Sequence, residues 1–278
     1  MRSFLKMNGL GNDFVIFDCR SDSQDLTLSE SQIRFIADRR LGVGCDQLII
    51  LHAAPAGAAI DAVMRIFNSD GSEVQTCGNA TRCVGKLIFA EKSAEEVVLE
   101  TLGGRLRLRR AANGLVAADL GRVRLDWAEI PLAEPRDSLH IPDFKTYGIG
   151  EGVATNVGNP HITFFVPTLD GVAITEIGPL IETHPLFAQR VNVGFAEMLG
   201  RHSLRLRVWE RGAGLTRACG SGATAAWIAA IRRGLGAGQG RVQLDGGELA
   251  IDWQDDGHAI MTGGASTSFS GVLADLPA

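Results

Sequence analysis

The sequence predicts an α+β fold of two pseudo-symmetric halves, each formed by several short strands around one central helix. Four short stretches recur in the same order at separations of 142 to 150 residues. Each half also alternates apolar with other residues, as in 61–67 and 204–209, which is typical of half-buried strands. Finally, a cysteine followed by small residues precedes one helical segment in each half.

The recurring stretches each contain a turn that leads into a strand or a helix. They are Gly11–Phe17 with Gly158–Phe164, Arg40–Gly44 with Arg190–Gly194, Thr76–Asn79 with Ala218–Ser221, and Gly103–Leu108 with Gly246–Ile251. One such similarity would be uninformative because glycine-rich turns are common, but four in one order indicate a duplication. A proline-containing stretch, 121–150, follows the first copy. We therefore expect an N-terminal half over 1–120 and a C-terminal half over 121–278, and leave open whether 266–276 pack on the first half.

The expected strands and helix occur in the same order in the two halves. Strands are expected within 14–17, 48–51, 61–67 and 103–108 of the first half, with a helix from Gly78 to Ala90, and within 162–164, 198–199, 204–209 and 246–251 of the second, with a helix over 222–231. Val84 and Ile88 form an apolar pair four residues apart, so the first helix should be half-buried. The second is apolar nearly all round and ends in Arg232–Gly234, so it belongs at the centre of its half.

Composition limits the classes of function. The chain has 27 basic and 32 acidic residues, a net charge of −5, and no basic cluster, so we expect a small-molecule ligand and no nucleic acid. The N-terminal residues lack the apolar stretch of a signal peptide and no long apolar run follows, so we expect a cytoplasmic protein without membrane contact. The five cysteines contain no C-x-x-C pair, which favours reduced thiols over a disulfide framework or a zinc site.

Two cysteines, Cys77 and Cys219, stand directly before the two helical segments. Unpaired backbone N–H groups and the positive end of the helix dipole meet there, which lowers a thiol pKa and favours a thiolate base. The N–H groups at Gly78–Asn79 and Gly220–Ser221 can hold a substrate carboxylate. Two such helix starts facing one another across a cleft would place a thiol on each face of a carbanion, so that proton removal and return invert the stereocentre.

The other three cysteines carry a simpler interpretation. A free cysteine is usually a small buried hydrophobe. The repeat matches only Cys77 with Cys219, so we interpret Cys19, Cys45 and Cys83 as structural.

Longer motifs carry a resemblance to a known family. They are residues 7–14 (MNGLGNDF), 41–47 (LGVGCDQ), 67–73 (FNSDGSE), 77–83 (CGNATRC), 158–161 (GNPH) and 210–222 (ERGAGLTRACGSG). Over essentially its whole length the chain resembles the diaminopimelate epimerases, cofactor-independent isomerases of lysine and peptidoglycan-precursor biosynthesis. The resemblance implies a fold of two similar α/β halves, each a mostly antiparallel sheet wrapped round a central helix, which face one another across a substrate cleft.

The resemblance also implies roles for individual residues. Cys77 and Cys219 are the two acid/base thiols that convert LL-2,6-diaminopimelate to the meso form without a cofactor or metal. The residues implied to bind this diamino dicarboxylate are Gly78, Asn79, Gly220 and Ser221 at the reacting carboxylate, Arg211 at the distal carboxylate, and Asn12, Gln47, Asn68, Asn159, Asn192 and Glu210 elsewhere in the pocket. His161 and Glu210 are implied to tune the thiol pKa values. Ala80 and Thr224 depart from the family's usual Gly and Cys, but neither is a matched ligand.

Other functions remain open at this point. A proline or hydroxyproline racemase or epimerase would share the two-thiol architecture, but its substrate lacks a distal group for Arg211. A thiol redox protein would need a resolving cysteine, and a pyridoxal phosphate enzyme a recognisable Schiff-base lysine. An amino-acid-binding module would use the same helix starts without breaking the C–H bond. We expect a homodimer, the commonest assembly, and closure of the halves to exclude water.

Overall fold

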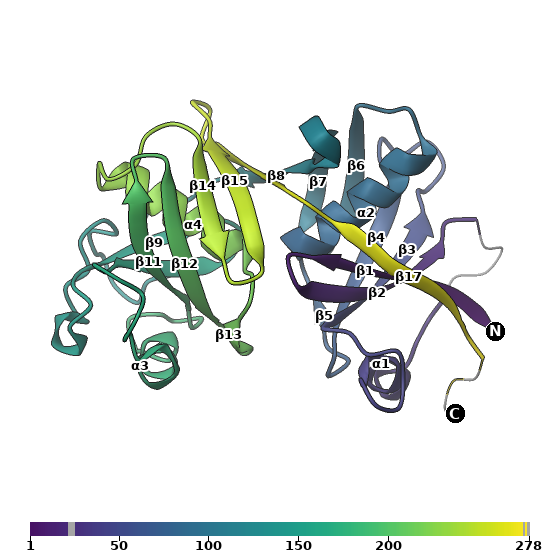
Figure 1. The fold of residues 1–278 in the computed structure, drawn as a ribbon, viewed down its shortest axis with the longest axis horizontal. Coiled ribbons are helices and arrows are strands. Elements are labelled where there is room, and N and C mark those ends of the chain that lie inside the picture. The colour runs from purple at the N-terminus through teal and green to yellow at the C-terminus, as the bar shows by residue number, and fades with distance from the viewer. Residues whose placement is uncertain (22–25, 275, 277–278) are drawn as a thin grey trace. The chain divides into compact units, whose positions relative to one another are not determined.

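The computed structural model describes residues 1–21, 26–274 and 276. The chain divides into two compact units, Met1–Ala118 with Gly263–Ala278 as unit 1 and Asp119–Thr262 as unit 2 (Figure 1). The boundary falls inside two strands, β8 (Val116–Arg122) and β16 (His258–Gly263). The segment from Gly263 onward clusters with unit 1, which is the alternative left open above for 266–276.

Unit 1 contains a sheet in the order β17-β1-β2-β3-β4-β6-β7. Its neighbouring strands are antiparallel except for the parallel pairs β2–β3 and β4–β6. A helix lies in the connection of each parallel pair, as such crossovers require. The bounds are β1 (Arg2–Gly9), β2 (Asn12–Cys19), α1 (Glu30–Ala37), β3 (Gln47–Ala53), β4 (Ala62–Asn68), β5 (Glu73–Val74), α2 (Gly78–Glu91), β6 (Glu96–Thr101), β7 (Gly104–Arg110), the 3-10 turn η1 (Ala112–Gly114) and β17 (Ser266–Leu273).

Unit 2 contains a sheet in the order β9-β10-β11-β12-β14-β15-β16. Its parallel pairs are β10–β11 and β12–β14, and the others are antiparallel. The bounds are η2 (Lys145–Tyr147), β9 (Gly152–Asn156), β10 (Pro160–Phe165), α3 (Ile174–Glu182), β11 (Asn192–Gly200), β12 (Ser203–Glu210), β13 (Gly214–Thr216), α4 (Gly220–Arg232), β14 (Gly240–Leu244) and β15 (Gly247–Trp253). The crossover helices are α3 and α4.

The two units repeat one arrangement of strands. The series β1-β2-β3-β4-β6-β7 and β9-β10-β11-β12-β14-β15 have the same succession of antiparallel and parallel pairs. This repetition confirms the predicted α+β class and the internal duplication.

One of the four predicted alignments is displaced. Arg40–Gly44 precede β3, whereas Asn192 is the first residue of β11, so its equivalent is Gln47, the first residue of β3. The alignment matched two glycines that have different structural roles. Gly44 takes a φ of +79°, a turn conformation, whereas Gly194 pairs with Thr163 inside a strand.

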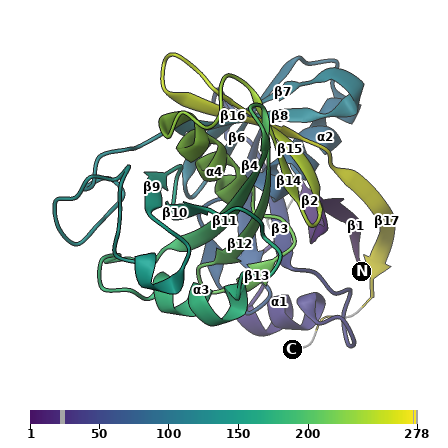
Figure 2. The ribbon, with the colours of Figure 1, turned by 60° about the vertical axis from the view of Figure 1, so that its left-hand side comes forward.

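The helices that follow the two cysteines are the central helices of their units. In unit 2, α4 contacts β9, β10, β11, β12, β14 and β15 (Figures 1 and 2). Every residue of α4 from Gly222 to Ala230 is buried. Its many small side chains allow this close packing, and its largest residue, Trp227, donates its indole N–H to the Gly238 carbonyl at 2.9 Å. In unit 1, α2 contacts β1, β6 and β7 and leaves Lys86 exposed, so it is half-buried as predicted.

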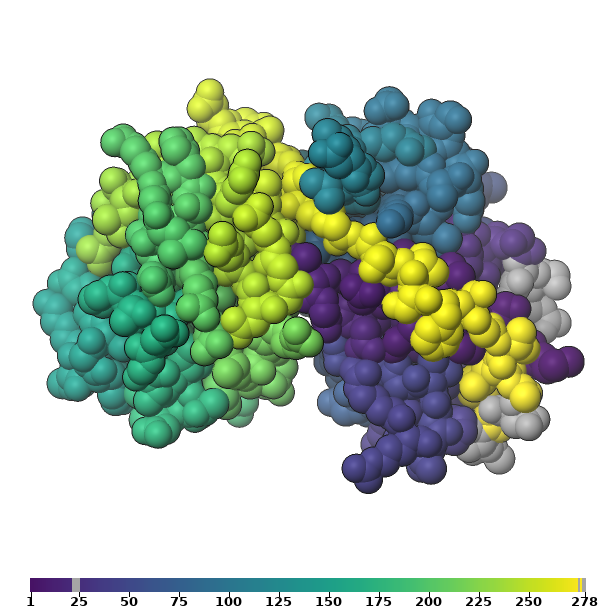
Figure 3. All heavy atoms as spheres, viewed as in Figure 1, coloured from purple at the N-terminus to yellow at the C-terminus, as the bar shows by residue number. Residues whose placement is uncertain are grey.

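Strand β17 brings the C-terminal segment onto β1. The two strands pair antiparallel with Leu5 opposite Ser270, and the C-terminal segment, in yellow, lies at the surface next to the purple N-terminal residues in Figure 3. Phe269 and Val272 remain 51% and 58% exposed. Of the helices in the described part of the chain, none has both the length and the apolar character needed to cross a membrane.

Candidate active site

Cys77 is the N-cap of α2 and is half-buried. Its carbonyl accepts from the Thr81 backbone N–H at 2.9 Å and from the Thr81 hydroxyl at 2.8 Å, which anchors the first helical turn. Its Sγ lies 3.9 Å from the side-chain oxygen of Asn12, to which the thiol donates. The helix therefore begins at the predicted residue, with the thiol in contact with a predicted substrate-binding residue.

Cys219 is the N-cap of α4 and is buried. Its sulfur accepts from the Gly222 N–H at 3.4 Å and lies 3.6 Å from Ser221 Oγ. Burial raises the pKa of the Cys219 thiol well above its usual range, and the Glu210 carboxylate raises it further, while the contacts with Ser221 and Gly222 lower it less. The expected lowering of the pKa by the helix start is thus outweighed at Cys219 by burial.

The amide side chains of unit 1 form a second group. Gln47 Nε2 donates to Asn68 Oδ1 at 3.0 Å, and Asn68 Nδ2 donates to Ser72 Oγ at 3.1 Å. Gln47 Oε1 is buried and has no hydrogen-bond partner among the described residues. A buried acceptor in this state costs about 1–3 kcal/mol, so the site gains if a ligand supplies a donor, such as an ammonium group.

In unit 2, His161 lies on β10 in contact with two other predicted residues. His161 Nε2 is 2.8 Å from Asn159 Oδ1 and 3.0 Å from Ser221 Oγ. Burial lowers the pKa of His161 to about 3, with a smaller contribution from the Arg211 charge. The imidazole is therefore neutral near pH 7. Because Asn159 Oδ1 can only accept, Nε2 carries the hydrogen in this arrangement.

Asn192, Glu210 and Arg211 meet where β11 begins and β12 ends. Asn192 Oδ1 accepts from the Arg211 backbone N–H at 2.9 Å, and the Thr216 hydroxyl donates to Glu210. Arg211 is exposed and donates through Nη1 to the Gln189 carbonyl at 2.8 Å. A planar guanidinium at such a surface suits bidentate contact with a carboxylate.

The predicted site residues occupy equivalent places in the two units. Gln47 and Asn192 begin β3 and β11, and Asn68 and Glu210 end β4 and β12. The remaining pairs are Asn12 with Asn159 at the start of β2 and just before β10, Cys77 with Cys219 as N-caps, and Gly78–Asn79 with Gly220–Ser221 in the first helical turns. Contacts join Asn12, Cys77 and Asn79 at the start of α2, and Asn159, His161, Glu210, Cys219 and Ser221 at the start of α4, while Gln47 and Asn68 form a separate pair.

Three further residues hold these side chains and were not predicted from the sequence. Asp46 accepts from Asn12, Arg82 donates to Asn79, and Glu182 accepts from the residues on either side of Glu210–Arg211. Asp46 and Arg82 lie inside the motifs 41–47 and 77–83, which is a signal that could have found them. No local pattern marks Glu182.

Comparisons with known proteins agree with this arrangement. A phenazine biosynthesis protein of the PhzF family from Bacillus anthracis superposes with a TM-score of 0.69 and 15% identity, over 98% of this chain and 99% of that one. A probable proline racemase from Agrobacterium radiobacter gives a TM-score of 0.66 and 16% identity, over 99% and 93% of the two chains. At such identities the likeness shows the fold alone, the class of two-unit proteins built on this repeat.

Sequence comparison is more specific. The profile of the diaminopimelate epimerase family matches residues 4–125 and 153–268. The diaminopimelate epimerase of Phenylobacterium zucineum is 51% identical over 276 residues, 98% of each chain. The chain belongs to the diaminopimelate epimerase family. The predicted family and its class, the isomerases, are confirmed.

Proposed function

We propose that this chain interconverts LL- and meso-2,6-diaminopimelate, with Cys77 and Cys219 as the acid and base and without a cofactor. The family supports the substrate. The observation that carries the mechanism is that a cysteine occupies the N-cap position of the central helix in both units. This reaction belongs to lysine and peptidoglycan-precursor biosynthesis.

The proposed chemistry needs one thiolate and one thiol. The thiolate removes the α-hydrogen as a proton, and the electron pair of the C–H bond stays on carbon as a carbanion conjugated with the carboxylate. The second thiol then gives its proton to the opposite face, which inverts the centre and leaves a thiolate there. Backbone N–H groups at Gly78–Asn79 and Gly220–Ser221 stabilise the negative charge on the carboxylate.

The remaining candidates bind and orient the substrate. We assign the distal carboxylate to Arg211, whose fork is exposed, and an ammonium group to the unpaired Gln47 Oε1. The other contacts are assigned to Asn12, Asn68, Asn159, Asn192 and Glu210. His161, being neutral, serves by donating hydrogen bonds rather than as a cation, while Glu210 next to Cys219 is positioned to accept that thiol's proton.

The test is incubation of reduced protein with LL-diaminopimelate in heavy water, following the meso product and deuterium at the α-carbon. We expect inversion with deuterium uptake, its loss in Cys77→Ala and in Cys219→Ala, and its retention in the matched control Cys19→Ala. Exchange into proline or hydroxyproline instead would reassign the substrate and keep the two thiols. Binding without any exchange would replace the enzyme by a binding module.

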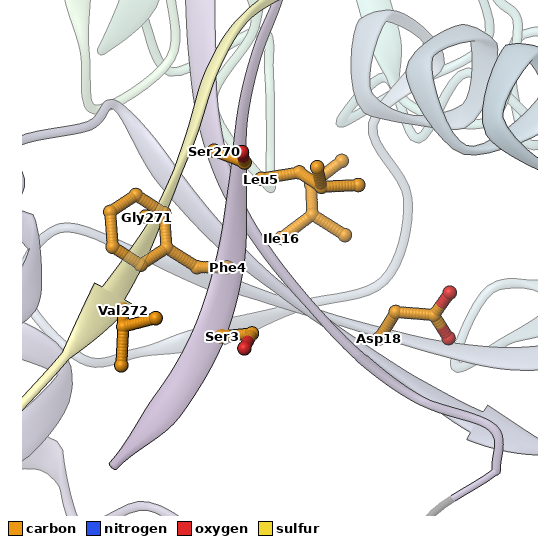
Figure 4. Close-up of a pocket in the computed structure, with 8 residues that line it drawn as sticks. All are labelled: Ser3, Phe4, Leu5, Ile16, Asp18, Ser270, Gly271 and Val272. Atoms are coloured by element: carbon orange, nitrogen blue, oxygen red, sulfur yellow. The ribbon is translucent and has the colours of Figure 1, made fainter.

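We also propose a cytoplasmic homodimer. The five cysteines are free thiols, which suits a reducing compartment. Strand β17 pairs with β1 and exposes Phe269 and Val272, next to a pocket lined by Phe4, Leu5, Ile16 and Gly271 among others (Figure 4). An exposed edge strand that carries large apolar side chains favours association with a second copy. Light scattering on wild type and Phe269→Glu tests it, since a dimer at this surface should dissociate in the variant.

A further inference from the structure

A chain of hydrogen bonds crosses the start of α2 and ends in a charge at each side. Asn12 Nδ2 donates to Asp46 Oδ2 at 2.8 Å, and Asn79 Nδ2 donates to Asn12 Oδ1 at 3.4 Å. Asn79 Oδ1 in turn accepts from Arg82 Nη2 at 2.8 Å. The order is therefore carboxylate, amide, amide, guanidinium, and every member lies in unit 1.

The two ends give this chain a single direction. A carboxylate only accepts and a guanidinium only donates, whereas an amide can turn to do either. The Asn12 NH₂ must therefore face Asp46, and the Asn79 carbonyl must face Arg82. As a result, the oxygen of Asn12 is the atom left toward Cys77, whose Sγ lies 3.9 Å away.

Both end groups are firmly held. Asp46 also accepts from the Asp13 backbone N–H at 3.0 Å and from Arg39 at 2.8 Å. Arg82 is buried, with an exposed fraction of 0%, in a helix whose first turn contains no acidic residue. A buried cation in that position is costly. Its Nη2 makes the short bond to Asn79 Oδ1, and its Nη1 and Nε donate to the Gly78 and Gly264 carbonyls at 3.4 and 3.5 Å, so the guanidinium is fixed in place.

We propose that Asp46 and Arg82 are positioning residues that fix the direction of the Asn12 and Asn79 amides, so that Cys77 faces a hydrogen-bond acceptor. An acceptor beside sulfur favours the thiol, whereas an amide N–H in its place favours the thiolate. Asp46 thereby sets the protonation of Cys77 without touching substrate. The inference rests on the proposed function only where it treats Cys77 as an acid and base.

Asp46→Asn tests the direction because an amide at position 46 can either accept or donate. Asn12 can then turn its NH₂ toward Cys77, and it gives up only the long 3.4 Å bond from Asn79 Nδ2 in doing so. We expect the pH midpoint of Cys77 alkylation by iodoacetamide, measured on peptides from native protein, to fall by about one pH unit, as one neutral hydrogen bond allows. We expect kcat/KM to fall about tenfold in both directions, since the equilibrium constant ties the two together.

Loss of the negative charge and loosening of the local structure are two other ways in which Asp46→Asn could shift the midpoint, and each has a control. Arg39→Gln removes the cation that pairs with both Asp13 and Asp46 and keeps both carboxylates, so both readouts should stay within about twofold of wild type. Loss of a surface charge is screened in about 1 M salt, where the Debye length is about 3 Å, so the midpoint shift should persist there. Arg82 and Cys83, which interact electrostatically with Cys77, are unchanged in both variants.

Arg82 is tested by activity alone, since its own charge acts on the Cys77 thiol. Arg82→Gln should lose kcat/KM and Arg82→Lys, which still only donates, should recover most of it. An unshifted midpoint and unchanged kcat/KM in Asp46→Asn, or the same losses in Arg39→Gln, overturn the proposal. The alkylation readout needs no turnover, so it separates failure of this inference from failure of the proposed reaction.

Discussion

Glu182 is the residue of unit 2 whose replacement gives the sharpest prediction. It ends α3, is 6% exposed, and accepts from the Trp209 indole N–H at 2.7 Å and from the Gly212 backbone N–H at 3.0 Å. These two donors flank Glu210 and Arg211 in the chain. Glu182 therefore holds both ends of the turn that presents two candidate substrate-binding residues.

The magnitude follows from the donors left without an acceptor. The Trp209 indole is half-buried and Gly212 is exposed, so water can replace part of each lost bond. A hydrogen bond to a charged group contributes about 1.5–3 kcal/mol, so Glu182→Ala, which removes two, should lower the free energy of unfolding by about 2–4 kcal/mol. Glu182→Gln keeps one acceptor and presents an NH₂ to the other donor, so it should cost about 1–3 kcal/mol. Arg190, 3.6 Å from Glu182 and mostly exposed, should contribute less than about 1 kcal/mol.

Urea unfolding and steady-state kinetics measure the two consequences. We expect the stabilities to rank wild type, then Glu182→Gln, then Glu182→Ala, and KM to rise in the Gln variant because the turn that carries Arg211 is no longer fixed. Arg190→Gln is the matched control, since it removes the ion partner and keeps both acceptors. A Glu182→Gln protein with wild-type stability and KM would refute the account of this turn.

Three further predictions concern packing and protonation. A Cβ at Gly240 would lie 1.9 Å from the Trp227 ring, so Gly240→Ala should cost about 1–3 kcal/mol in urea unfolding, and an unchanged midpoint contradicts this packing. Burial raises the pKa of Cys45 to about 11 and of Cys83 to about 12, so neither should react with iodoacetamide at pH 8 until urea unfolds the chain. Burial lowers the pKa of His161 to about 3, so below about pH 6.5 the unfolded chain binds a proton at this residue and the folded protein does not. The free energy of unfolding should therefore fall by about 2 kcal/mol from pH 7 to pH 5, and His161→Gln should lack that loss.

The sequence carried enough information for the repeat and for the thiols. Glycine turns mark where strands begin, and a cysteine before small residues marks the start of each central helix, so Cys77 and Cys219 could be paired before the fold was known. The same glycines misplaced one alignment, because a turn glycine such as Gly44 and a strand glycine such as Gly194 look alike in sequence. The equivalence of Gln47 and Asn192, the first residues of β3 and β11, emerges only once the strands are placed in their sheets.

Interactions between distant elements were beyond the sequence. A local argument from the helix start predicts a lowered pKa for Cys219. Burial within unit 2 and the carboxylate of Glu210, at the end of β12, raise that pKa instead. Glu182 lies 28 residues before Glu210 in a helix with no motif, so only packing reveals its role. Long-range burial and charge, rather than local pattern, decide such properties.

The two copies have diverged at the residues around sulfur. Asn68 and Glu210 end equivalent strands, and Asn79 and Ser221 occupy equivalent positions in the first turn of their helices. Cys77 consequently faces an amide oxygen whose direction is set by charges, whereas Cys219 is buried near a carboxylate. Two identical interacting sites could share one proton, but neither sulfur would then be favoured to hold it. The duplication therefore explains the shared backbone, and we expect its divergence at these few positions to determine which sulfur holds the proton.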